Sequence, residues 1–198
     1  EKLDKGFGQV LNKLGEKHFP VGTRAGELTS EMASQLSLPS GIPVATAIID
    51  AHSAVVASGV DTQGRMVMVM GTSTCHLIMD KKEVFVEGVA GVVKDGVLPG
   101  YYAYESGQAA VGDIFAWVTK LGLPEDYYKE SKEINISIHE LLLRKSIDQK
   151  VGQHGLLALD WLNGNRSVLM NSDLSGVLVG LTLNTKPEDI YRAMIEAT

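Results

Sequence analysis

The feature that most constrains the fold of this chain is a pair of apolar segments joined by a short polar bend. Residues 66–70 read Met-Val-Met-Val-Met and residues 77–79 read Leu-Ile-Met, with Gly71-Thr-Ser-Thr-Cys-His76 between them. Two strand-like segments joined through glycine and small hydroxyl side chains predict a hairpin. The backbone N–H groups of such a bend can point outward together and form a concavity that suits a phosphate. An ordinary β-turn without a ligand is the alternative interpretation.

A carboxylate precedes this bend at the end of another strand-like segment. Residues 44–49 are mostly apolar and predict a buried strand, and Asp50 follows them directly. Residues 51–60 are small and apolar and predict a tightly packed helix. Phosphoryl transfer to a hydroxyl needs a base beside the phosphate, so Asp50 is a candidate general base. The alternative is that Asp50 only caps the helix that follows it, which aspartate does often.

The composition excludes several classes of protein. A chain of 198 residues with 44% apolar residues can bury the core of one large domain, or of one and a part. Its formal net charge of −6 argues against a nucleic-acid-binding surface. The sequence has neither a segment that approaches the length of a membrane span nor a signal-peptide pattern, so we expect no contact with a membrane. The single cysteine excludes an internal disulfide framework and indicates a reducing compartment, which predicts a cytoplasmic protein.

The rest of the chain mixes helical and strand-like patterns. Apolar spacings of three and four residues predict helices at 2–15, 108–121 and 137–150. Thr29 can cap a short helix through Leu36, and Pro187 starts a last helix. Further strands are predicted at 88–93 and 156–162, a loop at 18–27, and a domain boundary at the turn 61–64. This order predicts an α/β chain with hairpins that is not plainly doubly wound. Because the chain starts at Glu1 rather than Met and ends within a helical pattern, we expect a fragment.

Three blocks of this sequence resemble the FGGY carbohydrate kinases. Ile49-Asp-Ala-His52 is similar to the family's catalytic aspartate block, and Met70-Gly-Thr-Ser-Thr-Cys-His76 is similar to its phosphate-side turn. The third block runs from Gly176-Val-Leu-Val-Gly180 to Ala193-Met-Ile-Glu196, with the spacing of the family's second sequence pattern. Within the family, this turn and residues 155–166 are most similar to the members that phosphorylate L-ribulose, although Leu162 stands where a second aromatic residue is expected.

The resemblance spans nearly the whole chain and implies a fold and an activity. The implied fold is part of an actin-like ATPase fold with a ribonuclease-H-like core, built from antiparallel hairpins and helices. Residues 1–60 would be the C-terminal tail of the sugar-binding N-terminal domain, and residues 61–198 the first part of the nucleotide-binding C-terminal domain. The implied reaction transfers the γ-phosphoryl group of ATP to the terminal hydroxyl of L-ribulose, giving L-ribulose 5-phosphate, with Mg²⁺ bridging the phosphates. We expect this chain by itself to be inactive, because the family's N-terminal phosphate loop and later adenosine motif are missing from it.

Two other functions stay open at this point. The chain could belong to another FGGY kinase, which acts on xylulose or glycerol. It could also be an actin-like ATPase module that is not a kinase and has no sugar substrate. The expected partners are a small sugar and ATP, without nucleic acid or membrane, and a homodimer is left open.

The resemblance also implies roles for particular residues. Asp50 would be the general base and would contact the sugar hydroxyl. Gly71, Thr72 and Ser73 would contact the phosphates of the nucleotide. Gly112, at the start of a predicted helix, would let the chain pass close to the nucleotide, with simple helix packing as the alternative. No residue of this chain is predicted to bind a metal.

Glu105 is the second predicted sugar contact. It follows a tyrosine-rich stretch and precedes Ser106-Gly107, so we expect it to reach into a cleft. A carboxylate there can accept hydrogen bonds from two sugar hydroxyls. The alternative is an acid on an exposed loop.

Several other polar side chains are expected to be structural. Cys75 and His76 are neighbours in a predicted strand, so their side chains point to opposite faces, and a buried cysteine is favoured over a thiol nucleophile. His52 is expected to support the site rather than to catalyse. Arg166 is expected to stabilise the C-terminal domain, with a phosphate contact as the alternative.

Overall fold

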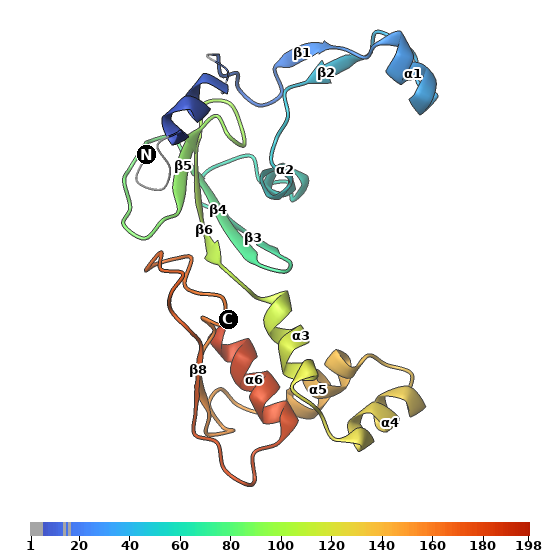
Figure 1. Cartoon of the computed structure of the whole chain (residues 1–198), viewed down its shortest axis with the longest axis vertical. Helices are drawn as coiled ribbons and strands as arrows, with labels where there is room; N and C mark the ends of the chain where they lie inside the picture. The colour runs from blue at the N-terminus through green and yellow to red at the C-terminus, as the bar shows by residue number, and fades with distance from the viewer. Residues whose placement is uncertain (1–5, 14, 16) are drawn as a thin grey trace.

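The computed structural model describes residues 6–13, 15 and 17–198, and its elements form three parts along a long axis (Figure 1). A narrow arm lies at one end, an antiparallel sheet with a helix beside it lies in the middle, and helices with a two-stranded ribbon lie at the other end. The elements in chain order are the 3₁₀ helix η1 (Phe7–Lys13), β1 (Arg24–Glu27), α1 (Ser30–Leu36), β2 (Pro43–Ala45), α2 (Asp50–Ala57), β3 (Met66–Met70), β4 (Thr74–Asp80), β5 (Gly91–Lys94), β6 (Tyr102–Gln108), α3 (Gly112–Lys120), α4 (Glu125–Glu133), α5 (Ile138–Ser146), β7 (Leu157–Leu159), β8 (Val177–Val179) and α6 (Pro187–Ala197).

The middle part is a four-stranded, fully antiparallel sheet with the strand order β3-β4-β6-β5. β3 and β4 form the hairpin that the sequence predicts, with Met70 opposite Thr74 across the bend. Leu77, at the centre of β4, pairs with Val67 of β3 and with Glu105 of β6. The predicted α/β class with antiparallel hairpins and helices is confirmed.

One face of this sheet packs against α2. Side chains alternate along a strand, so Leu77 and Met79 of β4 point to the same face, where both are buried. Val55 of α2 packs in the same core, and Ala51, in the first turn of the helix, lies at its margin. Burial of Val55 therefore fixes where the N-terminal end of α2, with Asp50, lies on the sheet.

The helical part has its own core between α3, α5 and α6. Its buried members are Ala110, Ile114, Val118, Leu142, Tyr191 and Met194. Two of the helices begin where local signals predict. Ser137 precedes α5 and accepts a hydrogen bond from the N–H of Glu140 at 3.1 Å, and Pro187 lies in the first turn of α6.

We expect Leu142→Ala to lower the free energy of unfolding by about 2–5 kcal/mol, because its side chain is fully buried and the cavity left behind cannot fill completely. The neighbouring Leu143 is 40% exposed on the same helix, so Leu143→Ala is the matched control and should cost far less. Denaturant unfolding of the two variants measures the difference. Equal losses would show that α5 does not pack as the structure has it.

α4 lies in a segment for which the apolar pattern predicts no helix. Its sequence, Glu-Asp-Tyr-Tyr-Lys-Glu-Ser-Lys-Glu, is mostly charged. Polar contacts with α6 and α5 help to hold it to the other helices. The hydroxyl of Tyr127 donates to the buried carboxylate of Glu188 in α6 at 2.6 Å, and Glu130 forms an ion pair with Lys145 of α5 at 2.7 Å. Tertiary contacts therefore stabilise a helix whose sequence has few apolar residues.

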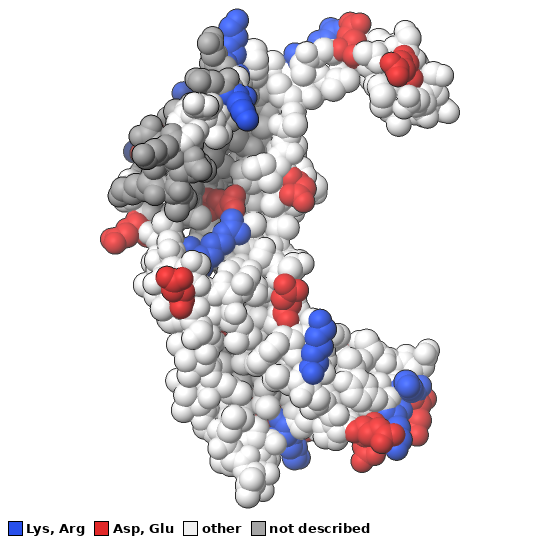
Figure 2. All heavy atoms as spheres, viewed as in Figure 1, with Lys and Arg blue, Asp and Glu red and all other residues white. Residues whose placement is uncertain are grey.

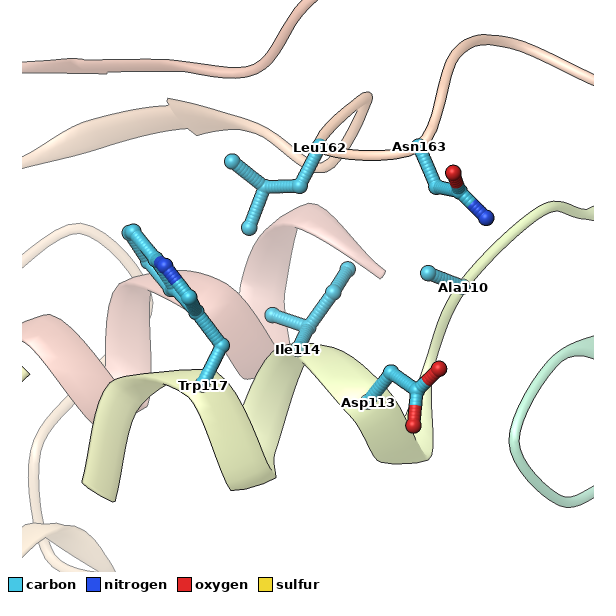
Figure 3. Close-up of a pocket in the computed structure, with 6 residues that line it drawn as sticks. All are labelled: Ala110, Asp113, Ile114, Trp117, Leu162 and Asn163. Atoms are coloured by element: carbon cyan, nitrogen blue, oxygen red, sulfur yellow. The ribbon is translucent and has the colours of Figure 1, made fainter. Parts of the chain in front are cut away.

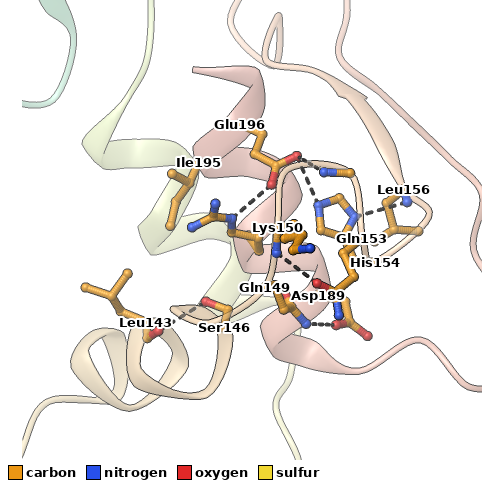
Figure 4. A network of polar contacts seen from close by, with 12 residues as sticks. Leu143, Ser146, Gln149, Lys150, Gln153, His154, Leu156, Asp189, Ile195 and Glu196 are labelled. Atoms are coloured by element: carbon orange, nitrogen blue, oxygen red, sulfur yellow. Dashed lines mark hydrogen bonds and ion pairs between the residues drawn. The ribbon is translucent and has the colours of Figure 1, made fainter.

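The segment after α5 is tied to α6 by polar contacts (Figure 4). Gln149 donates to Asp189 at 2.7 Å, and the N–H of Gly152 donates to Glu196 at 3.0 Å. Arg192, one turn before Glu196, donates to its other oxygen at 2.9 Å. These bonds hold the chain that leads into β7 against α6.

His154 completes this network. Its side chain is fully buried, and its Nδ1 accepts the N–H of Leu156 at 3.0 Å. The ring proton is therefore assigned to Nε2, which lies 3.2 Å from a carboxylate oxygen of Glu196. Burial alone would raise the pKa of Glu196, but the hydrogen bonds from Arg192 and Gly152, with His154, outweigh it and hold that pKa below its usual range.

Some local predictions are wrong. The predicted buried strand at 44–49 is only the short strand β2, whose residues are exposed and which pairs with β1, in a segment predicted as a loop. The pairing partner is distant in sequence, so local pattern could not reveal it. The helix predicted from residue 108 starts at Gly112, because β6 continues to Gln108. Of the helix predicted at 2–15, the described part is the 3₁₀ helix η1, and residues 1–5 and 14 lie outside the described residues.

Within the described residues, none of the helices combines the length and the apolar character that crossing a membrane would require.

Candidate active site

Asp50 is the first residue of α2, and its side chain is exposed. The residue before it, Ile49, occupies the N-cap position and makes no side-chain hydrogen bond. One oxygen of Asp50 accepts the N–H of Ala51 at 2.8 Å, and the Ser53 hydroxyl donates to the Asp50 carbonyl at 2.6 Å. The helix end favours a negative charge at this place. Asp50 is therefore held at the N-terminus of the helix with its carboxylate open to solvent, rather than at the end of the predicted strand.

The bend at residues 71–73 is fixed from outside by the start of α3. The carbonyl of Gly71 accepts the N–H of Gly112 at 3.0 Å, and the carbonyl of Thr72 accepts the N–H of Val111 at 2.8 Å. Within the bend, the N–H of Gly71 donates to the carbonyl of Ser73 at 2.8 Å. These contacts do not use the N–H groups of Thr72 and Ser73. Within the described part of the chain, the bend thus keeps two backbone donors for another group.

Gly112 is placed directly against this bend. A Cβ at this position would lie 2.8 Å from the Gly71 carbonyl oxygen and 3.5 Å from the Cα of Thr72. Both are backbone atoms, so a side chain could enter only if the bend moved. The structure thus brings together the residues predicted to contact the nucleotide, and it gives Gly112 a packing role whether or not a nucleotide binds beside it.

Glu105 lies within β6, in the interior of the sheet, and not on a loop. One carboxylate oxygen, Oε2, lies 3.0 Å from Nε2 of His52. The other oxygen, Oε1, accepts a short hydrogen bond from Arg166 and lies 3.7 Å from the Sγ of Cys75. The interpretation of Glu105 as an exposed loop acid is therefore wrong. A strand residue has its direction set by the register, which local sequence does not reveal.

The surroundings of Glu105 favour its charged form. Burial alone would raise the pKa of its carboxyl, but the hydrogen bond from His52 and the positive charge of Arg166 together outweigh burial and lower that pKa. Glu105 is therefore an anion at neutral pH. Its ionised state contributes stability that is present at higher pH and is lost as the pH falls through its lowered pKa.

Sequence reasoning did not find the contacts of His52 and Arg166 with Glu105. The three residues come from α2, the loop after β7 and the strand β6, which are far apart in the chain. Cys75 joins them because it lies on β4, beside β6, at 3.4 Å from Nη1 of Arg166. The sequence offered one signal for this contact. Side chains alternate along a strand, so Cys75 and His76 point to opposite faces of the sheet, and Cys75 is the one on the face of Glu105.

The elements that carry Asp50, the bend and Gly112 lie along one hollowed flank of the molecule (Figures 1 and 2). α2 contacts both β3 and β4, and the bend joins these same strands. Figure 1 places α2, the β3–β4 hairpin and the start of α3 one after another along this flank, and Figure 2 shows that the flank is hollowed between the arm and the helical part. A ligand in this hollow could therefore meet α2 and the bend together.

A separate cavity of about 310 Å³ lies between α3 and the loop after β7 (Figure 3). Ile114 and Trp117 of α3 face Leu162 across it, with Asp113 and Asn163 at the other end. Its lining includes neither Asp50 nor the bend. This cavity is not the candidate site.

The sheet, the hairpin bend and the helices packed behind it define part of an actin-like ATPase fold, the fold of a class of sugar kinases. The crystal structure of xylulose kinase from Rhodospirillum rubrum matches it with a TM-score of 0.72 at 24% identity, over 90% of this chain and 34% of that one. Residues 66–198 match the FGGY family of carbohydrate kinases, C-terminal domain, and the chain belongs to this family.

Relatives within the family include ribulokinases. That of Halalkalibacterium halodurans is 54% identical over 189 residues, which make up 96% of this chain and 34% of the relative. That of Staphylococcus aureus (strain Newman) is 44% identical over 199 residues, covering 100% of this chain and 36% of the relative. The chain thus spans about a third of the length of the curated relatives that it matches.

Proposed function

We propose that this chain is part of an ATP-dependent kinase that transfers the γ-phosphoryl group of ATP to the terminal hydroxyl of L-ribulose, giving L-ribulose 5-phosphate. The observation that carries the proposal is that Asp50 and the bend belong to elements that share the same two strands. Asp50 begins α2, which packs against β3 and β4, and the bend joins these strands. The identity of 54% with a ribulokinase supports the choice of sugar.

Asp50 acts as the general base in this proposal. A sugar hydroxyl is a poor nucleophile at neutral pH, and a carboxylate within hydrogen-bond reach can take its proton as the phosphoryl group arrives. The exposed carboxylate of Asp50 can accept this proton, because among the described residues only the N–H of Ala51 donates to it. The bond between the phosphorus and the leaving oxygen of ADP breaks as the bond to the sugar oxygen forms.

The bend would hold the phosphates. The unused N–H groups of Thr72 and Ser73 can donate to phosphate oxygens. The N-terminus of α3, which lies against the bend, adds the positive end of a helix dipole. In this arrangement the absence of a side chain at Gly112 lets the N-terminus of α3 lie directly against the bend.

Glu105 would orient the sugar. Its Oε2 accepts from His52 alone and keeps a second lone pair for a sugar hydroxyl, whereas Oε1 accepts from Arg166 and also faces the thiol of Cys75. Because its carboxyl is ionised at neutral pH, it accepts and does not donate.

A divalent metal, which we propose to be Mg²⁺, would neutralise charge on the phosphates during transfer. Among the described residues, His, Cys, Asp and Glu side chains do not gather in groups of three or more that could hold such an ion. The ion would therefore be held by the phosphates of ATP rather than by a cage of side chains from this chain.

The domain division is also part of the proposal. We assign residues 1–60 to the tail of a sugar-binding N-terminal domain and residues 61–198 to the start of a nucleotide-binding C-terminal domain. The match to the family's C-terminal domain begins at residue 66, which supports this boundary. The single cysteine supports a cytoplasmic location.

The test is a sugar panel with a protein of the relatives' full length that contains this chain. With ATP and Mg²⁺, we expect the highest kcat/KM for L-ribulose among L-ribulose, xylulose and glycerol. A preference for xylulose or glycerol would move the protein to another member of the family. ATP hydrolysis without phosphorylation of any of these sugars would favour an ATPase module instead.

A further inference from the structure

His52 lies between two hydrogen-bond acceptors. Its Nδ1 is 3.3 Å from the carbonyl oxygen of Gly96, and its Nε2 is 3.0 Å from Oε2 of Glu105. Its side chain is 6% exposed, so water does not replace either partner easily. A carbonyl oxygen can only accept, and an ionised carboxylate can only accept. The ring therefore lies between two acceptors, and the geometry assigns Nε2 of His52 the role of donor to the Glu105 carboxylate.

Glu105 is held from two sides. His52 of α2 binds one carboxylate oxygen, and Arg166 of the loop after β7 binds the other. Cys75 of β4 is the third titratable group that faces this carboxylate, at 3.7 Å from Oε1. With both oxygens engaged, the carboxylate cannot rotate without losing a charge-assisted hydrogen bond, and such bonds are about twice as strong as neutral ones.

We infer that His52 and Arg166 are positioning residues, which fix the direction and charge of the Glu105 carboxylate. His52 also ties α2, the helix that begins with Asp50, to β6, the strand that carries Glu105. This inference rests on the proposed function, in which both carboxylates meet the sugar. His52 is two residues from Asp50 on the same helix, so a shift of His52 also moves the general base. Misplacement of a reacting group by about 1 Å can cost roughly a hundredfold in rate.

The kinetic test uses His52→Ala, His52→Gln, Arg166→Gln and Arg166→Lys in a protein of the relatives' full length that contains this chain. We expect His52→Ala and Arg166→Gln to lower kcat/KM for L-ribulose by about 10- to 100-fold, with KM for ATP changed by less than about twofold. His52→Gln and Arg166→Lys should recover part of this loss, because each keeps a hydrogen-bond donor. The controls are His139→Gln and Arg144→Gln, whose side chains contact Tyr191 and Glu140 in the helical part.

The pH profile separates positioning from mere stabilisation. His52 and Arg166 lower the pKa of Glu105, so removing either should raise that pKa. The acid limb of kcat/KM for the sugar should then move to higher pH in His52→Ala and Arg166→Gln, and stay in place in the controls. Variants that melt earlier but keep the sugar kinetics and the acid limb of the parent protein would overturn the inference.

A second measurement does not depend on kinase activity. ¹⁵N NMR of a protein of the relatives' full length that contains this chain should show a hydrogen-bonded proton on Nε2 of His52, and this signal should change in Glu105→Gln. An Nε2 without a proton in the parent protein would overturn the inference even if the sugar panel supports the proposed kinase. A proton on Nε2 that bonds Glu105, together with no sugar phosphorylation, would overturn the proposed function and leave the pairing intact.

Discussion

Asp50→Asn should reduce sugar phosphorylation by about a hundred- to ten-thousandfold while ATP binding stays nearly unchanged. Asparagine has almost the same shape and its oxygen can still accept the N–H of Ala51, so the start of α2 should be preserved. What it cannot do is take a proton from the sugar hydroxyl. The measurement is kcat with L-ribulose in a protein of the relatives' full length that contains this chain, together with an ATP titration.

Asp61→Asn is the matched control for this prediction. Asp61 is an exposed acid in the turn between α2 and β3, and nothing assigns it to the site. It should turn over sugar at the rate of the parent protein. Unchanged turnover in Asp50→Asn as well would remove Asp50 from the role of general base, and Asp50 would then only stabilise the start of its helix.

Gly112→Ala should weaken ATP binding by tenfold or more and lower the free energy of unfolding by about 1–3 kcal/mol. The new Cβ would lie 2.8 Å from the carbonyl oxygen of Gly71, which is closer than real Cβ contacts allow. Because the obstructing atom is backbone, the bend itself has to move, and with it the N–H groups of Thr72 and Ser73 that we propose to bind phosphate. ATP titration and denaturant unfolding measure the two effects separately.

Gly26→Ala is the control for this substitution. A Cβ on Gly26, in β1 of the arm, meets no atom within 4 Å, so this variant should keep both stability and ATP affinity. If Gly112→Ala lost stability but bound ATP as well as the parent protein, Gly112 would be a packing glycine only. The proposed phosphate contacts at the bend would then be wrong.

Several features that depend on residues near one another in sequence were predicted correctly. The β3–β4 hairpin follows from two apolar segments around Gly71-Thr-Ser, and the short helix α1 begins where Thr29 accepts the N–H of Met32. Such signals act over a few residues, so their energies do not depend on the rest of the fold. The family resemblance pointed to Asp50, the bend and Gly112 as site residues. The place of Glu105 after a tyrosine-rich stretch pointed to a sugar contact, and all these roles stay predictions.

Features that depend on distant partners were missed. β1 and β2 pair with each other across α1, and α4 is held by contacts with Glu188 and Lys145 rather than by its own pattern. Neither contact leaves a periodic trace in the local sequence. The same holds for the strand that carries Glu105, whose direction is set by its pairing with β4 and β5.

The amino-acid sequence by itself determined the hairpin and most of the helices, because turn residues, caps and apolar spacing act locally. The family was indicated by the resemblance of three sequence blocks. Only the tertiary structure decided that α3 rests on the bend through Gly112, and that His52 and Arg166 hold the two oxygens of Glu105. The physical reason is that strand register and helix packing set side-chain directions across the fold. A charged side chain finds its partner, and two backbone segments come into close contact, only after those elements have packed together.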